Sequence, residues 1–294
     1  MFNFNLYNPF QDNITNNNDR NNYNIYIQGG PGKGLANNMW AIATAVYYKE
    51  KYGLNNIILK TTDSILYGTC NKFGRNTYRS KDNNTIITYG ETFFKKLRFC
   101  LRNVENCDIV NNDFSCVKII PKGDIEIKGF CANLDLFHEY HEKIPNYLYL
   151  DDKETLEYIK KTYENLEKGI MIGIRRGPDG GWKQLDKEAY KKALNKLIEM
   201  NIDISHLFIL TDTKDAWKNI IDLDNEFPAT EIREDDYTQF LAGMMCKHFV
   251  ITESSYHWWI AYMGILKNPK KKVFYFDKSN YNIHNLILPE WIKI

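Results

Sequence analysis

The sequence predicts an α/β protein with mainly parallel sheets, because short apolar runs alternate with amphipathic segments along most of the chain. The alternation is clearest in the second half, with strands expected at 170–174, 206–211, 248–252 and 272–277 and helices at 152–168, 186–200, 235–246 and 254–265. Strand–helix–strand connections of this kind are right-handed, so the strands run parallel and their carboxyl ends meet at one edge. Asp152 is expected to cap the first of these helices.

The first half shows the same pattern with more interruptions. Ten of the first 24 residues are asparagine, so residues 1–22 are expected to form an arm without regular structure. The elements expected after the arm are strands at 23–28, 57–60 and 124–129, a helix at 35–52 that ends before Gly53, and a helix near 91–101.

Length and composition limit the classes of protein that fit. At 294 residues the chain exceeds the usual single-domain size, and Pro145 marks a hinge, so we expect two domains, 23–145 and 146–294. A formal net charge of +1 argues against a general nucleic-acid binder, and no apolar run is long enough to span a membrane. Six scattered cysteines and a start that does not resemble a signal peptide favour reduced thiols and a cytoplasmic location.

The most informative stretch is 171–182, where an apolar run ends in two arginines, Arg175 and Arg176. Guanidinium groups present a rigid fork of donors that matches phosphate oxygens. The loop that follows contains three glycines, which let backbone amides approach the same anion, and one acid, Asp179. The stretch therefore predicts a binding site for a polyanion at the carboxyl edge of the sheet.

Two further strands end in groups that suit a phosphate. One ends in Thr211 and Asp212, and another ends in Glu253, Ser254 and Ser255 directly before a helix. A serine at a helix start caps free amides, and those amides together with the helix dipole attract anions. Three such strand ends in one half of the chain predict a pocket for a nucleoside diphosphate.

The motifs resemble those of the α1,2-fucosyltransferases. The segment 34–40 is similar to their Gly-Leu-Gly-Asn-Gln-Met-Phe signature, and 173–179 resembles their His-x-Arg-Arg-Gly-Asp motif. The strand end 210–212 is similar to Phe-Ser-Asp, and 253–262 resembles Asn-Ser-Ser-Phe-Ser-Trp-Trp-Ala-Ala-Trp. A weaker match covers 129–140, and all the matches fall in the family's order.

This resemblance implies a GT-B-like fold, with two Rossmann-like domains, mainly parallel sheets and a facing cleft. It also implies inverting transfer of fucose from GDP-fucose to a hydroxyl of a glycan or glycoprotein, with no metal or other cofactor. The positions that it implies for nucleotide and substrate binding are Gly34, Asn37, Asn38, Arg175, Arg176, Asp212, Glu253, Ser254 and Ser255.

The chain also departs from the family pattern. Gly173 stands where the motif has histidine, Pro178 is inserted before Asp179, and Glu253 replaces an asparagine. These departures leave open a transferase for another nucleotide-activated deoxysugar on the same fold. A catalytically silent glycan-binding relative is a further alternative, against which the retained arginines and serines argue.

The expected catalytic residues follow from the chemistry of the leaving group. Arg175 and Arg176 can stabilise the charge that develops on the β-phosphate without a metal. In-line attack by an acceptor hydroxyl needs a base on the other face of the sugar, and Asp179 is the nearest candidate in sequence, with Glu253 as its rival. A loop-bracing role for Asp179 also remains open.

Other motifs carry less weight. The segment 29–34 lacks the spacing of a P-loop, and the Asp-x-Asp at 222–224 is expected to be a surface turn. His138 and His141 have no third ligand with them, so we expect no metal site there. His257 precedes two tryptophans and is expected to be a packed or capping residue.

Overall fold

The computed structural model describes residues 22–28, 35–60, 92–100, 107–112, 118–129, 132–175, 185–211, 216–219, 227–276 and 286–294. The chain divides into two compact units. One comprises Met1–Leu150 with His284–Leu286, and the other comprises Asp151–Ile283 with Ile287–Ile294. Apart from Asn22, the expected N-terminal arm lies outside the described residues.

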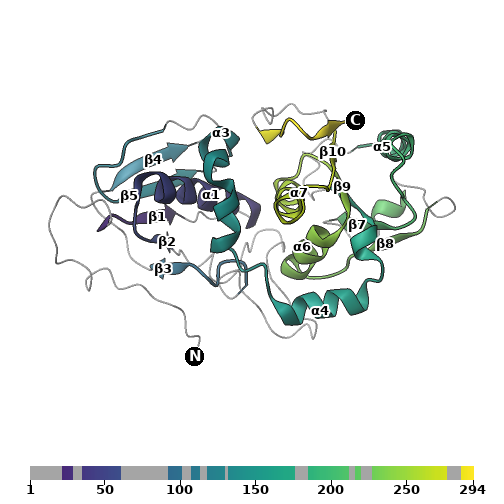
Figure 1. The fold of residues 1–294 in the computed structure, drawn as a ribbon, viewed down its shortest axis with the longest axis horizontal. Helices are drawn as coiled ribbons and strands as arrows, with labels where there is room; N and C mark the ends of the chain where they lie inside the picture. Colours follow the sequence, from purple (N-terminus) through teal and green to yellow (C-terminus); the bar gives the residue numbers. More distant parts are fainter. Residues whose placement is uncertain are drawn as a thin grey trace. The chain divides into compact units, whose positions relative to one another are not determined.

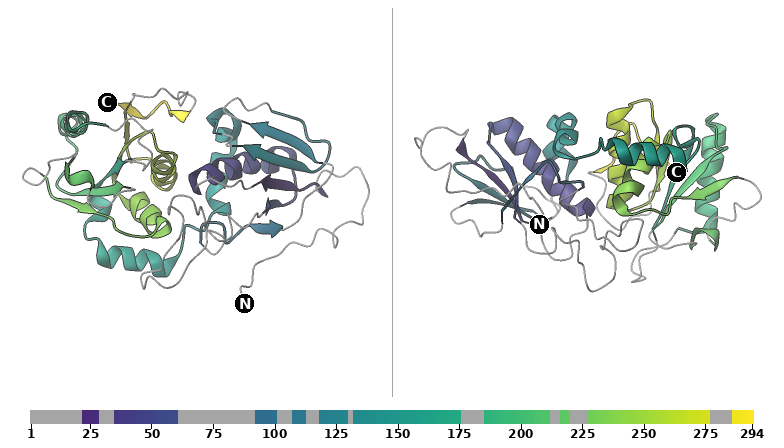
Figure 2. Two further views of the ribbon diagram at one scale, coloured as in Figure 1. Left: turned by 180° about the vertical axis from the view of Figure 1, so that it is seen from behind. Right: turned by 90° about the horizontal axis from the view of Figure 1, so that it is seen from below.

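The first unit is built on a five-stranded parallel sheet in the order β3-β2-β1-β5-β4 (Figure 1). Its strands are β1 (Ile25–Gln28), β2 (Ile57–Lys60), β3 (Arg98–Cys100), β4 (Asp108–Asn112) and β5 (Ile125–Gly129). Its helices are α1 (Leu35–Tyr52), α3 (Leu134–Phe137) and the 3-10 segment η2 (His138–Tyr147). Helix α1 packs on β1, β2 and β5, and α3 and η2 pack on α1 (Figure 2).

Two local predictions for this unit had different outcomes. Helix α1 ends as expected before Gly53, whose φ of 68° is the left-handed conformation that glycine adopts most easily. The helix expected near 91–101 is wrong, because residues 92–97 form turns that lead into β3. Phe93 and Phe94 are both fully buried in those turns, so tertiary packing outweighs the local helical pattern.

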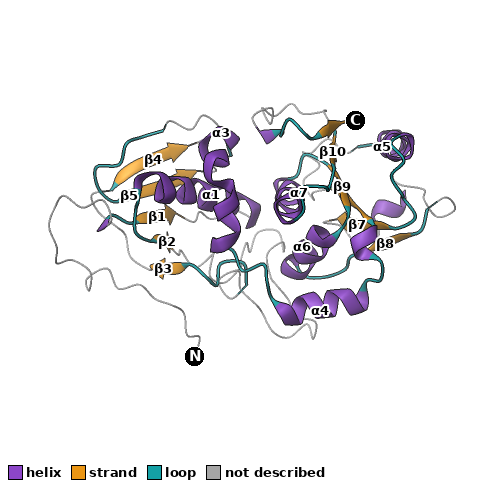
Figure 3. Cartoon of the chain, viewed as in Figure 1, coloured by secondary structure: helices purple, strands orange, loops and turns teal. Residues whose placement is uncertain are grey.

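The second unit has a six-stranded parallel sheet in the order β11-β10-β9-β6-β7-β8. Its strands are β6 (Ile170–Ile174), β7 (Leu207–Thr211), β8 (Ala229–Glu231), β9 (His248–Ile251), β10 (Val273–Tyr275) and β11 (Ile292–Lys293). Its helical segments are α4 (Lys153–Thr162), η3 (Leu166–Lys168), α5 (Lys187–Glu199), η4 (Ala216–Asn219), α6 (Asp236–Met245) and α7 (Ser255–Lys267). Strands and helices alternate along this unit (Figure 3). The prediction of an α/β fold with mainly parallel sheets is confirmed.

Side-chain caps fix where the helices of this unit begin. Asp152, Asp186, Asp235 and Ser254 each accept a hydrogen bond from the amide three residues ahead. The expected cap at Asp152 is confirmed, but the helix behind it is shorter than expected. It ends at Thr162, and Asn165 adopts a left-handed φ of 61° before η3 begins.

Strand β6 is buried on both faces and lies at the centre of the core. On one face, Ile172 and Ile174 belong to the cluster that includes Leu194 and Leu197 of α5. On the other face lie α6 and α7, where Gly243 of α6 packs so closely that an added Cβ would be 3.2 Å from the Met171 sulfur. The two layers of helices hold β6 between them, and with it the position of Arg175, which directly follows the strand.

No helix among the described residues is both long enough and apolar enough to span a bilayer.

Candidate functional site

The carboxyl ends of β6, β7 and β9 meet at one edge of the second sheet. In the ladder, Ile174 of β6 pairs with Thr211 of β7, and Ile172 pairs with Val250 of β9. Arg175 after β6, Thr211 at the end of β7 and Thr252 after β9 therefore lie along the same edge. Arg175 follows β6 and is partly exposed, and Thr211, the last residue of β7, is partly exposed as well.

The capped start of α7 lies at this edge as well. Ser254 is the N-cap, is 6% exposed, and accepts a hydrogen bond at 3.5 Å from the His257 amide. Its own amide donates at 2.7 Å to the carbonyl of Thr252, which turns the chain from β9 into the helix. Ser255 is exposed, and the first turn contains no acid. Glu253 is partly exposed and directly precedes the cap, so a negative side chain borders the positive end of the helix.

The glycine of the arginine strand is in close contact with a histidine of α7. A Cβ built on Gly173 would lie 2.5 Å from Nδ1 of His257 and 2.7 Å from its Cγ. His257 is 4% exposed, and its Nδ1 lies 3.3 Å from the hydroxyl of Thr252. The expectation that His257 is a packed residue is confirmed. Its closeness to Gly173 was missed, although a glycine within a bulky strand and a histidine three residues after a cap were both visible signals.

A buried tyrosine of α5 contacts the same end of β6 that His257 of α7 contacts. The Tyr190 hydroxyl of α5 donates at 3.3 Å to the carbonyl of Gly173. Burial raises the pKa of Tyr190 well above its usual value, so the phenol stays protonated and keeps donating. The backbone just before Arg175 is therefore held by a hydrogen bond from α5 and by ring contact from α7.

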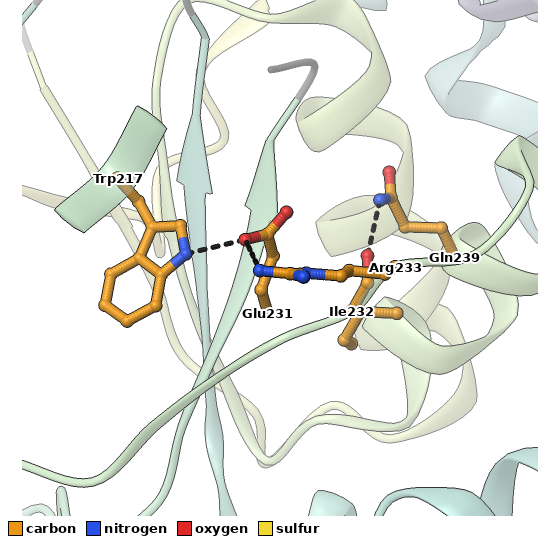
Figure 4. Close-up of polar contacts among 5 residues, drawn as sticks. All are labelled: Trp217, Glu231, Ile232, Arg233 and Gln239. Atoms are coloured by element: carbon orange, nitrogen blue, oxygen red, sulfur yellow. Dashed lines mark hydrogen bonds and ion pairs between the residues drawn. The ribbon is translucent and has the colours of Figure 1, made fainter. Parts of the chain in front are cut away.

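Strand β8, which pairs with β7, carries Glu231, whose side chain is 6% exposed (Figure 4). Oε2 of Glu231 accepts from the Trp217 indole at 2.7 Å and from Arg233 at 3.2 Å. The side chain of Gln239 donates at 2.9 Å to the carbonyl of Ile232, which fixes the segment after β8 to α6. Sequence reasoning missed this cluster, because its members come from η4, β8 and α6, which only the fold brings together.

Six predicted site residues need separate mention. Gly34, Arg176, Asp179 and Asp212 lie outside the described residues. In the first unit, Asn37 and Asn38 lie in the first turn of α1, where Asn38 is 1% exposed and Asn37 is partly exposed.

The described part of the chain contains no cluster of three or more histidine, cysteine or acidic side chains arranged to hold a metal ion. His138 and His141 stack their rings with centroids 4.7 Å apart. The Asp-x-Asp at 222–224 lies outside the described residues.

Comparison with known proteins gives a match in fold only. No protein-family model and no curated protein matches the sequence. The fucosyltransferase NodZ from Bradyrhizobium matches with a TM-score of 0.51 and 12% identity, over 88% of this chain and 96% of that chain. A glycosyl transferase of family 9 from Veillonella parvula matches with a TM-score of 0.51 and 8% identity, over 92% and 86%. The chain thus has the α/β fold of the GT-B glycosyltransferases.

Proposed function

We propose that this protein is a glycosyltransferase that uses a nucleoside diphosphate sugar, with GDP-fucose as the donor and a glycan hydroxyl as the acceptor. One observation carries the proposal: Arg175, the end of β7 and the capped start of α7 share one edge of the second sheet. Ligands of open α/β sheets bind outside the carboxyl ends of the strands, which is this edge. The motif resemblance supports fucose as the sugar.

The chemistry assigned to each group follows from charge. As the bond between the anomeric carbon and the β-phosphate oxygen breaks, negative charge grows on the diphosphate. Arg175 and Arg176 offset it, together with the amides at the start of α7. The acceptor oxygen forms its bond from the opposite face and loses its proton to a carboxylate, for which we propose Asp179 ahead of Glu253. Attack from the opposite face inverts the anomeric centre.

We further propose that transfer needs no metal, because paired guanidiniums supply the charge that a divalent cation provides in other transferases. Turnover should then survive EDTA. Activity that is lost in chelator and restored by Mn²⁺ would contradict this and direct attention to the Asp-x-Asp at 222–224.

The location proposed for the enzyme is the cytoplasm. Cys100, Cys107 and Cys246 are free thiols, and reduced thiols are typical of that compartment. Burial raises the pKa of Cys107 to about 11 and that of Cys246 to about 12, so both stay protonated.

The decisive experiment is a melting panel with GDP, UDP, dTDP and their sugars, followed by calorimetry. A ligand at a hundred times its Kd should stabilise the fold by about 2.7 kcal/mol. We expect this shift with GDP and GDP-fucose, and an α-linked product by NMR when acceptor glycans are added. A shift with dTDP or UDP alone would favour the other deoxysugar transferase. Binding of glycans without any nucleotide would favour the silent relative.

A further inference from the structure

Gly173 is a glycine for reasons of space rather than of backbone conformation. Among the described glycines, positive φ angles occur at Gly53 and Gly129, and Gly173 is not one of them. It lies in a regular parallel ladder, between two isoleucines that are buried. What excludes a side chain is the His257 ring, because three of its atoms would lie within 3.0 Å of an added Cβ.

The His257 ring joins three segments of the site edge. It lies against the backbone of β6 two residues before Arg175, and its Nδ1 is within hydrogen-bonding distance of Thr252, just past the end of β9. Its own amide is bound by the capping side chain of Ser254. The ring thus links the strand that carries the arginine to the turn that presents the α7 amides.

The ring of His257 and a side chain at position 173 would compete for the same space. The contact between the two residues shows that the imidazole supplied by α7 takes the space that a side chain on β6 would need.

We propose that Gly173 and His257 form an interlocking pair, and that His257 is a positioning residue for the nucleotide site. It holds the β6 end, and so Arg175, in register with the start of α7. The proposal rests on the proposed function for its ligand, a nucleoside diphosphate. The pairing itself is a property of the protein alone.

Single substitutions should break the pair from either side. Gly173→Ala pushes the ring away, and His257→Ser removes it. A misplacement of about 1 Å at a site that positions reacting groups can cost about 10²-fold in rate, so each variant should lose about 10- to 100-fold in kcat/KM. GDP affinity should fall in both, because Arg175 and the α7 amides no longer meet the same diphosphate.

The exchange variant gives the sharpest test. Gly173→His combined with His257→Ser returns the imidazole from the strand side. We expect it to recover most of the GDP affinity and kcat/KM lost by His257→Ser, whereas Gly173→His alone should overlap the native ring and be the worst of the set. In a double-mutant cycle, residues in contact give effects that do not add.

Gly264 of α7 offers a matched control. A Cβ there would lie 2.4 Å from Cζ of Phe249, so Gly264→Ala creates the same kind of overlap, toward the other end of the same helix. It should lower the melting temperature while the folded protein binds GDP as the wild type does. The control separates general loss of packing from loss of positioning.

The outcomes divide cleanly. Recovery in the exchange variant, with normal GDP affinity in Gly264→Ala, supports the proposal. If Gly173→Ala and His257→Ser bind GDP and turn over like the wild type, or if their effects simply add, the proposal is wrong. If the wild type binds no nucleotide, the proposed function and the positioning role both fail. In that case a double-mutant cycle measured on the free energy of unfolding still decides whether the two residues interact.

Discussion

The two ends of the second sheet use close glycine contacts for different purposes. Toward the amino ends of the strands, Gly169 and Gly264 each receive the ring of a phenylalanine, with a Cβ position 2.3 Å from Phe208 and 2.4 Å from Phe249. At the carboxyl edge, the ring against Gly173 is an imidazole with a hydrogen-bonding partner. Packing alone is satisfied by hydrocarbon, so a polar ring at the carboxyl edge is consistent with a role in the site proposed there.

Histidine also occurs at the amino edge, where its role is structural. Nδ1 of His248 accepts a hydrogen bond at 3.1 Å from the amide of Lys272, so the ring is bound in its neutral form. Burial, with Lys247, Lys272 and Lys271 nearby, lowers the pKa of His248 to about 4. The comparison therefore predicts that variants at the amino edge change stability and that variants at the carboxyl edge change ligand binding.

The largest effect is expected from Phe249→Ala at the amino edge. Phe249 is fully buried, and removing its ring should lower the free energy of unfolding by about 3–5 kcal/mol. Chemical denaturation measures this loss, and Phe249→Leu should cost less because it leaves a smaller cavity. Calorimetry on the folded protein should show unchanged GDP affinity. A loss of GDP affinity in the folded Phe249→Ala variant would contradict the prediction that variants at the amino edge change stability alone.

Arg175→Ala should give the reverse pattern. Removing one partner of a desolvated charge pair should weaken GDP binding by about 2–4 kcal/mol and abolish transfer. The free energy of unfolding should change much less than in Phe249→Ala, because Arg175 is partly exposed whereas Phe249 is fully buried. Arg175→Lys keeps the charge but loses the paired N–H donors of the guanidinium, so its GDP affinity should lie between those of the wild type and Arg175→Ala. Unchanged GDP affinity in Arg175→Ala would remove this residue from the site.

The proposed base should affect rate without affecting binding. Asp179→Asn should lower kcat by at least about tenfold, because a positioned acid–base group contributes about 10²–10⁴ in rate and an amide cannot accept the proton. GDP affinity should stay near that of the wild type. Steady-state kinetics of Asp179→Asn and Glu253→Gln decide between the two acids. Normal turnover in the first and none in the second would make Glu253 the base.

The smallest effect is a pH dependence from the amino edge. The pKa of His248 is about 4 in the folded protein, against an ordinary value of 6.5 that applies to the unfolded chain. The stability that neutral His248 contributes is therefore present above pH 6.5 and is lost as pH falls toward 4. Between pH 7 and pH 5.5 the loss should be about 1 kcal/mol. Plots of the free energy of unfolding against pH, from chemical denaturation, should be steeper for the wild type than for His248→Gln over this range. Identical slopes would show that His248 does not titrate as described.

Local chemistry explains which features the sequence could predict. The caps at Asp152 and Ser254 and the end of α1 at Gly53 depend on neighbours within a few residues, and all are recognisable in the sequence. The strand ends of the site followed from the alternation of elements and the parallel sheet. The contact of Gly173 with His257 joins distant parts of the chain, and no periodic pattern encodes it.

The close approach at Gly173 also restricts the mutational routes from this arrangement to one in which β6 carries the imidazole. Rings at both positions would overlap, since even one added carbon comes within 2.5 Å of His257. Small residues at both positions would leave a void. A lineage that changes one codon at a time must pass through one of these states, and the void is the milder step because surrounding side chains can partly fill it. A mutational library that varies only one of the two codons therefore samples only the unfavourable intermediates.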